Sequence, residues 1–236
     1  LAAFVAANAF PDAAGLAATI AAAPTLDMLS GERIAAELFQ LLRADAAPAV
    51  LRIMATHGVL AHLLPVTESF ERLARLIAIE EELGLPDPLR RLAALLPRDA
   101  EIADRAADRL KLSNDERERL AAMAVPSPMV AADMDGAARG RALYRLGERQ
   151  FVDLALLTWA GGPTAAAAAW RGHLAAARNW VRPVLPVGGA DVLALGLPRG
   201  PRVGEALAAV ERWWEAGEFR AGRAEALEKL REITNA

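Results

Sequence analysis

LSGERIAAELFQLL, residues 29–42, has the residue spacing of an amphipathic helix. Large aliphatic side chains recur there at i, i+4, i+7 and i+8, which places them on one helical face. They are Ile34, Leu38, Leu41 and Leu42. Outward from this segment nearly every stretch has helical periodicity, and the helix formers Ala, Leu, Arg and Glu dominate. Strand alternation is almost absent, so the sequence predicts an all-α, multi-helical fold.

Local signals mark where the helix within residues 29–42 begins. Ser30 stands immediately before the apolar stripe and is the predicted N-cap. Glu32 follows in the first turn, where the positive end of the helix dipole favours an acid. Arg33 and Glu37 are four residues apart and are predicted to form an i,i+4 ion pair.

Proline, glycine and capping residues delimit the other helices. Pro48 opens a second helix, which Gly58 is placed to end. A charged helix is predicted over residues 100–110. Ser113 is predicted to cap the next helix, because Glu116 follows three residues later and completes a capping box.

The composition excludes several classes of site. The 236 residues contain no cysteine and three histidines, so disulfides, thiolate metal sites and cysteine nucleophiles are absent, and a zinc site is not expected. We expect no metal ligands and no catalytic residues in this chain. Residues 154–170 carry no charge, but Gly161-Gly162-Pro163 breaks them into two helices, so no membrane span is predicted. The lack of cysteine suits a reducing compartment, and a cytoplasmic location is expected.

Positive charge is concentrated in the second half of the chain. The net charge is −3, yet residues 136–202 contain nine arginines and only three acids. Such a span is where an RNA backbone is expected to bind. The candidate RNA-binding arginines in its first part are Arg139, Arg141, Arg145 and Arg149.

Two short helical patterns meet at a Gly/Pro/Arg elbow within residues 186–207, PVGGADVLALGLPRGPRVGEAL. A loop of this composition leaves backbone N–H groups at a helix start, where a phosphate can bind. The candidate residues at the elbow are glycines, whose backbone N–H groups a phosphate can approach, and arginines, whose guanidinium groups suit phosphate. They are Gly188, Gly189, Arg199, Gly200 and Arg202. The alternative is a plain αα-hairpin whose glycines serve only a tight turn.

Four segments, taken in order, resemble one protein family. They are residues 29–38 (LSGERIAAEL), 57–65 (HGVLAHLLP), 91–96 (RLAALL) and 110–116 (LKLSNDE). With the Gly-rich tail they are similar to the bacterial tRNA nucleotidyltransferase (CCA-adding enzyme) and poly(A) polymerase family. The resemblance implies an elongated arrangement of three helical units. These are a neck over residues 1–67, a body over 68–182 and a tail over 183–236.

The resemblance covers only the family's RNA-binding helical portion. It implies that Arg33 and Glu37 in the neck support the nucleotide pocket, and that the body and tail bind tRNA or other RNA 3′ ends. In the family, catalysis with CTP or ATP and Mg²⁺ belongs to an N-terminal head with a Gly-Ser loop and an Asp-x-Asp pair. Neither is found here, and residues 1–4 resemble the family's sequence immediately after its base-reading motif. We therefore expect an inactive fragment of a longer enzyme, with no cofactor of its own.

Some residues imitate functional motifs. Asp133-Met134-Asp135 has the Asp-x-Asp spacing, but we interpret it as a solvated helix start. Residues 87–91, DPLRR, imitate the base-reading motif in the wrong place and are interpreted as an interhelical turn. His57 and His62 are five residues apart, off the spacing for a shared metal on one helical face, which favours helix-end or core roles. Of the pair Trp213 and Trp214, one ring is expected to be buried and one half-exposed.

Two alternatives remain open on the sequence. CCA addition and poly(A) addition share this helical half, so the parent enzyme can be a poly(A) polymerase. A helical protein–protein scaffold with solvated arginines and no RNA role is the rival from another class. The sequence does not determine the oligomeric state.

Overall fold

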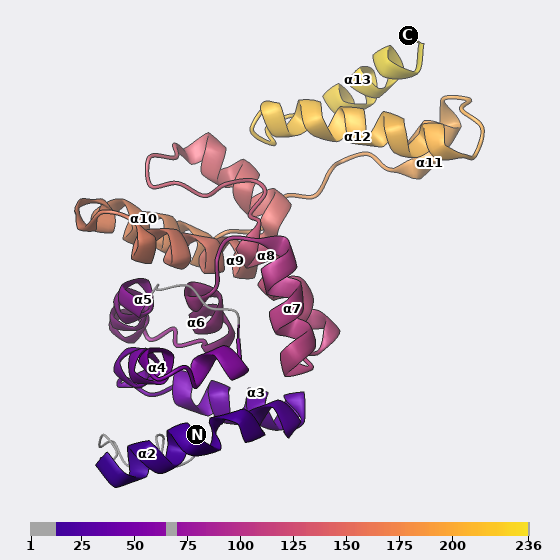
Figure 1. The fold of residues 1–236 in the computed structure, drawn as a ribbon. Helices are drawn as coiled ribbons and strands as arrows, with labels where there is room; N and C mark the ends of the chain where they lie inside the picture. Colours follow the sequence, from indigo (N-terminus) through magenta and orange to yellow (C-terminus); the bar gives the residue numbers. More distant parts are fainter. Residues whose placement is uncertain (1–12, 65–69, 236) are drawn as a thin grey trace. The chain divides into compact units, whose positions relative to one another are not determined.

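The computed structural model describes residues 13–64 and 70–235, and throughout them the fold is all-α, as predicted (Figure 1). Up to residue 124 the elements are, in chain order, α2 (Ala13–Ala22), the 3₁₀ turn η1 (Ala23–Met28), α3 (Gly31–Leu42), α4 (Ala47–Thr56), the 3₁₀ turn η2 (Leu60–His62), α5 (Phe70–Leu83), α6 (Pro88–Leu95), α7 (Ala100–Leu110) and α8 (Asn114–Ala124). After residue 124 they are α9 (Gly136–Gly161), the 3₁₀ turn η3 (Thr164–Ala166), α10 (Ala167–Arg178), α11 (Gly189–Ala194), α12 (Pro201–Ala216) and α13 (Arg223–Asn235).

Two compact units divide the chain. The first unit comprises residues 1–133 and 148–177, and the second comprises 134–147 and 178–236. Helix α9 contributes to both, because Gly147 interrupts it with φ 74° and ψ 166°. Glycine adopts this positive φ without the Cβ clash that other residues suffer. The expected division into neck, body and tail stays a prediction.

Leucine side chains from α3, α5 and α6 build the core of the first unit. The predicted apolar stripe of α3 is confirmed, since Ile34, Leu38, Leu41 and Leu42 are at most 1% exposed. Helix α6 packs on α3, α5 and α8, and α3 also packs on α7. Each large side chain buried in this way contributes about 1.5–3 kcal/mol to folding. Helix α3, in the predicted neck, therefore packs directly on α6 and α7, which lie in the predicted body.

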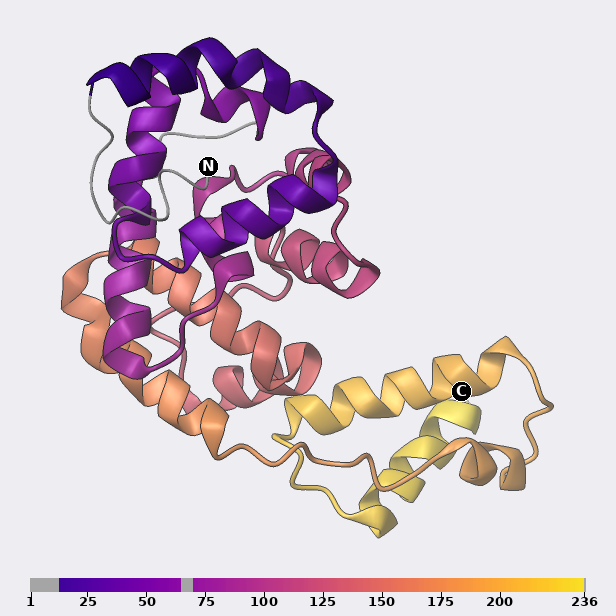
Figure 2. The same cartoon turned by 90° about the horizontal axis from the view of Figure 1, so that it is seen from below.

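The second unit has a small core of its own. Helices α11, α12 and α13 pack together, and α12 and α13 lie side by side in both Figure 1 and Figure 2. The core residues are short or β-branched with one leucine: Val187, Val192, Ala206, Val210, Ala226 and Leu230. Trp214 is buried while Trp213 is partly buried, which confirms the expected division of that pair.

Predicted helix ends are confirmed where they depend on capping residues. Ser30 caps α3 by accepting a hydrogen bond from the Arg33 N–H. Ser113 and Glu116 form the complete capping box of α8. Helix α7 covers residues 100–110 as predicted. These ends are set by hydrogen bonds between residues three apart, so sequence alone identifies them.

Candidate RNA-binding surfaces

The start of α3 is fitted closely to the end of α7. A Cβ atom at Gly31 would lie 2.4 Å from the backbone oxygen of Arg109 and 2.7 Å from Lys111 Cγ. Such distances are well inside van der Waals contact, so α7 leaves no space for a side chain there. Arg109 also joins α7 to η1, the turn that precedes α3, because its Nη2 donates to the Leu26 oxygen at 3.0 Å. The requirement for glycine within the Ser-Gly-Glu-Arg-Ile segment is tertiary, and the sequence pattern did not reveal it.

The expected ion pair between Arg33 and Glu37 is not formed in the described part of the chain. Arg33 is exposed at the first turn of α3. Glu37 lies one turn later and is partly buried, with its Oε2 atom shielded from solvent and without a hydrogen-bond partner. The prediction of a pair was wrong, since the Arg33 side chain lies in solvent whereas the Glu37 carboxylate is partly buried. The support that these residues were expected to give a nucleotide pocket stays a prediction.

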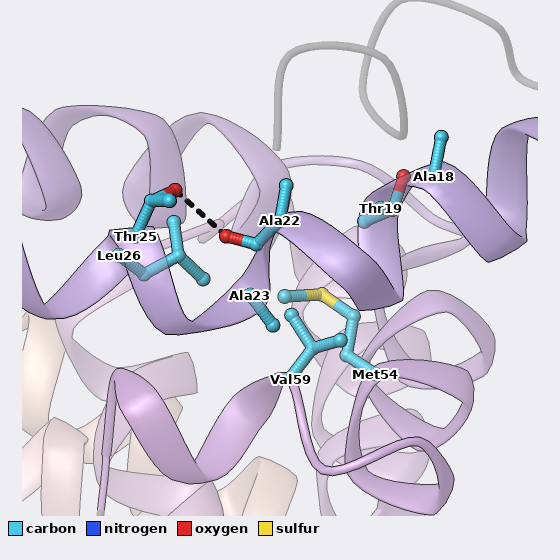
Figure 3. A pocket seen from close by; sticks show the side chains of 8 residues that line it. All are labelled: Ala18, Thr19, Ala22, Ala23, Thr25, Leu26, Met54 and Val59. Carbon is cyan, nitrogen blue, oxygen red and sulfur yellow. Dashed lines mark hydrogen bonds between the residues drawn. The ribbon is translucent and has the colours of Figure 1, made fainter.

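A pocket of about 320 Å³ lies between the α2–η1 segment and the α4–η2 segment (Figure 3). Small and apolar side chains form most of its lining, with Met54 and Val59 on one side and Ala18, Ala22, Ala23 and Leu26 on the other. Its two hydroxyls are already used, because Thr19 donates to the Gly15 oxygen and Thr25 to the Ala22 oxygen. The lining carries no charge, so the pocket does not suit a phosphate.

Helix α6 brings two arginines into the interior of the first unit. Arg90 and Arg91 are 4% and 0% exposed, and both donate to the buried carboxylate of Glu80 on α5. Arg91 also donates to the Leu42 oxygen at the end of α3 and to Glu81. Buried charges persist only when they are paired and hydrogen-bonded, and this group meets that condition.

The buried network continues into α8 and α9. Asp153 is 1% exposed and accepts hydrogen bonds from Arg90 and Arg119. Arg119 also donates to Asp87 at 2.6 Å. Burial alone would raise the pKa of Asp87, but hydrogen bonds from Arg119 and the Arg90 N–H outweigh it and lower that pKa below its ordinary value. The prediction of an interhelical turn over residues 87–91 was therefore wrong beyond Asp87: Asp87 is the N-cap of α6, and Pro88 to Arg91 form the first turn of that helix. The same residues belong to an ion network that the sequence pattern did not reveal.

The candidate arginines of α9 fall into both units. Arg139, Arg141 and Arg145 precede the break at Gly147, whereas Arg149 follows it and is exposed in the first unit. Within the second unit Arg145 pairs with Glu215 at 2.6 Å. Arg139 and Arg141 are partly buried. Their contact with RNA stays a prediction, and the Arg145 side chain has a partner in the folded chain.

In the first half of the elbow, around Gly188, the backbone donor is already bound by the carboxylate of Asp191. Asp191 accepts a hydrogen bond from the Gly188 N–H at 2.8 Å and pairs with Arg223 at 2.5 Å. Hydrogen bonds from Arg223 and then Gly188 lower the pKa of Asp191. Its carboxylate therefore lies at the start of α11, where an anionic ligand would otherwise bind. Gly189 follows as the first residue of that helix.

The second half of the elbow is open. Arg199, Gly200 and Arg202 are exposed, and in the described part of the chain neither arginine forms an ion pair. Gly200 is the N-cap of α12 and has no side chain to cap it. Pro201 has no N–H, and the Val203 N–H is used by the Gly200 oxygen. The two exposed guanidinium groups are thus the elbow's candidates for anion binding, and their contact with RNA stays a prediction.

Residues that imitate other functional motifs have structural roles. Asp135 accepts a hydrogen bond from the Ala138 N–H at the start of α9, which confirms the predicted helix start. His57 ends α4, and His62 pairs with Asp27 at 3.1 Å. Over residues 13–64 and 70–235 no set of three metal-ligating side chains converges. No helix in these two ranges has the length and apolar character needed to cross a membrane.

Comparison with known proteins bears on the first unit. A family model described as the probable RNA and SrmB-binding site of polymerase A matches residues 12–71. An uncharacterized 28 kDa protein in the petA 5'region of Rhodospirillum rubrum is 44% identical over 79 residues. That alignment covers 30% of this chain and 30% of the relative. Residues 12–71 contain the capped start of α3 and the segment 57–65, and the match supports an RNA-binding helical region similar to that of poly(A) polymerases.

Proposed function

We propose that this chain is the RNA-binding helical part of a nucleotidyltransferase that extends RNA 3′ ends, of the CCA-adding or poly(A)-adding kind. The observation that carries the proposal is the polymerase A match over residues 12–71, which includes the Ser30-capped helix α3 and its packing on the rest of the first unit. Nucleotide transfer from CTP or ATP with Mg²⁺ belongs, in this proposal, to a catalytic head outside these 236 residues, in a cytoplasmic enzyme.

The charge of the matched segment favours other parts of the chain for most phosphate contacts. Residues 12–71 contain seven acids and three arginines, so this segment has few groups that can neutralise phosphates. Phosphate contacts are therefore assigned to arginines elsewhere in the chain, including the elbow pair Arg199 and Arg202. An A-form helix gives little access to base edges, so these contacts are expected to recognise backbone and shape.

A fluorescence titration of labelled tRNA with the full chain, at low and at physiological salt, tests the proposal. Binding is expected to weaken steeply as salt increases, because each neutralised phosphate releases counterions. Reversing both elbow charges with Arg199→Glu and Arg202→Glu is expected to weaken binding about tenfold or more. The matched control is Arg212→Glu with Arg220→Glu, which reverses two other exposed arginines of the second unit. Absence of tRNA binding by the unaltered chain at low salt contradicts the proposal.

A second candidate function is protein docking, and one observation favours it. The description of the matching family includes SrmB besides RNA, and the uncharged pocket of Figure 3 lies within the matched residues. An apolar side chain of a partner protein suits this lining better than a phosphate does. Ala22→Glu would place a charge at the pocket. Loss of a protein partner with unchanged tRNA affinity would favour docking as the role of this segment.

A further inference from the structure

Three arginines of the first unit gather where α5 and α6 meet the end of α9. Arg72 and Arg75 are on α5, one turn apart, and Arg98 follows α6. Arg72 Nη2 donates to the Ala93 oxygen at 2.7 Å, and a Cβ at Gly161 would lie 3.6 Å from its Cδ. Arg75 Nη1 donates to the Gly162 oxygen at 3.2 Å. We call these three residues the α5 arginine cluster.

The acids next to this cluster are engaged elsewhere. Glu71 pairs with Arg52 at 2.6 Å, and Asp99 accepts the Ile102 N–H at the start of α7. Glu82, at the far end of α5, pairs with Arg171. Throughout residues 13–64 and 70–235, no carboxylate forms an ion pair with Arg72, Arg75 or Arg98. After the hydrogen bond from Arg52, the charge of Arg75 also contributes to the lowered pKa of Glu71, but in the described part of the fold no carboxylate is in ion-pair contact with the cluster.

Arg72 adds a third, partly buried positive charge to the cluster. Its Nε atom is buried and has no hydrogen-bond partner. Burial, followed by the charge of Arg98, lowers the pKa of Arg72 to about 10. The guanidinium is still charged at neutral pH, so the folded chain keeps two repelling cations close together. An oxyanion would stabilise three neighbouring cations, with the exposed Arg75 and Arg98 making the contacts and Arg72, whose Nε is shielded, acting through its charge.

We propose that Arg72, Arg75 and Arg98 form a binding site for a phosphate of the RNA backbone. This proposal rests on the proposed RNA-binding function. It assigns a phosphate contact to three arginines that lie outside both the matched segment and the elbow. Guanidinium groups suit this task because their N–H donors form paired hydrogen bonds to phosphate oxygens. Arg75 and Arg98 are exposed and accessible to a backbone, while Arg72 is partly buried against the Ala93 oxygen and contributes its charge.

A purely structural role is the competing explanation. The Gly162 oxygen lies just beyond the C-terminus of α9, where carbonyl oxygens and the helix dipole attract cations. That role requires charge near the helix end but does not require RNA. Stability and RNA affinity must therefore be measured on the same variants.

The test uses the full chain with Arg75→Gln and Arg98→Gln together, titrated with labelled tRNA over a series of salt concentrations. We expect about tenfold weaker binding at low salt and a salt-dependence slope reduced by about 1 to 2, because up to two phosphate contacts are lost. The double variant Arg75→Lys with Arg98→Lys keeps both charges and is expected to retain part of the affinity and most of the slope.

The matched control is Arg117→Gln with Arg171→Gln. These arginines belong to the same unit and their removal changes the net charge equally, but both are paired with acids. If the control weakens tRNA binding as much as the cluster variant, or if the cluster variant binds like the unaltered chain, the phosphate site is wrong and the proposed function survives. If the unaltered chain does not bind tRNA, both fail. Thermal unfolding of each variant shows whether an affinity change reflects loss of fold.

Discussion

Arg91 and Arg72 belong to the same helical unit, yet their guanidinium groups have opposite surroundings. Arg91 is fully buried and donates to Glu80, Glu81 and the Leu42 oxygen. Arg72 is partly buried and donates to a single backbone oxygen, with no carboxylate among its described partners. The first arginine holds α3, α5 and α6 together. The second leaves charge for a ligand, so an arginine-rich composition by itself does not identify an RNA-binding surface.

The largest expected effect comes from making the same substitution in both arginines. Arg91→Met leaves the Glu80 carboxylate buried with one cation fewer, which is expected to cost about 3–5 kcal/mol in the free energy of unfolding. Arg72→Met removes a cation without an acidic partner, so a change within about 1 kcal/mol is expected. Urea unfolding followed by circular dichroism measures both. Equal losses in the two variants would remove the distinction between a structural arginine and an open one.

A second variant tests the packing beside the network. Gly31→Ala places a Cβ against the Arg109 oxygen and forces α3 away from α7, at an expected cost of about 1–3 kcal/mol. Gly172→Ala in α10 is the matched control, because a Cβ there meets nothing within 4 Å. The control is expected to gain up to about 1 kcal/mol from helix propensity. Thermal unfolding of the pair checks the difference, and a stable Gly31→Ala variant would show that the junction yields easily.

The smallest effect is a dependence of stability on acidic pH, a range in which Asp87 of the network titrates and the arginines of the cluster stay charged. The lowered pKa of Asp87 means that the unfolded chain takes up a proton before the folded chain does as the pH falls. The contribution is complete above about pH 4, the ordinary range of an aspartate, and is lost as the pH falls through the lowered pKa.

Asp87→Asn isolates this contribution, because asparagine also caps a helix and keeps the hydrogen bond at the start of α6. Urea unfolding of both proteins from neutral pH to about pH 3 should show their free energies of unfolding converge as the pH falls. A constant difference over the whole range would mean that Asp87 acts only as a cap.

The structure adds most where contacts join distant residues. Sequence reasoning treated residues 87–91 as a turn and left Arg90 and Arg91 without a role, although they meet Asp153 and Leu42. It placed candidate RNA contacts at Arg145, which pairs with Glu215 in the folded chain. It gave no role to Arg72, Arg75 and Arg98, because nothing in their spacing reveals that the neighbouring acids are engaged elsewhere. The proposed RNA contacts at the elbow remain predictions.

The sequence by itself determined the all-α class, the stripe of α3 and the ends of helices capped by Ser30 and Ser113. These features depend on periodicity and on hydrogen bonds between residues three or four apart. Only the tertiary structure decided which arginines are neutralised, why position 31 must be glycine, and that α9 contributes to two units through Gly147. The physical reason is distance along the chain. A charge is neutralised by whichever acid the fold brings within a few ångströms, and Asp153 lies 63 residues from Arg90.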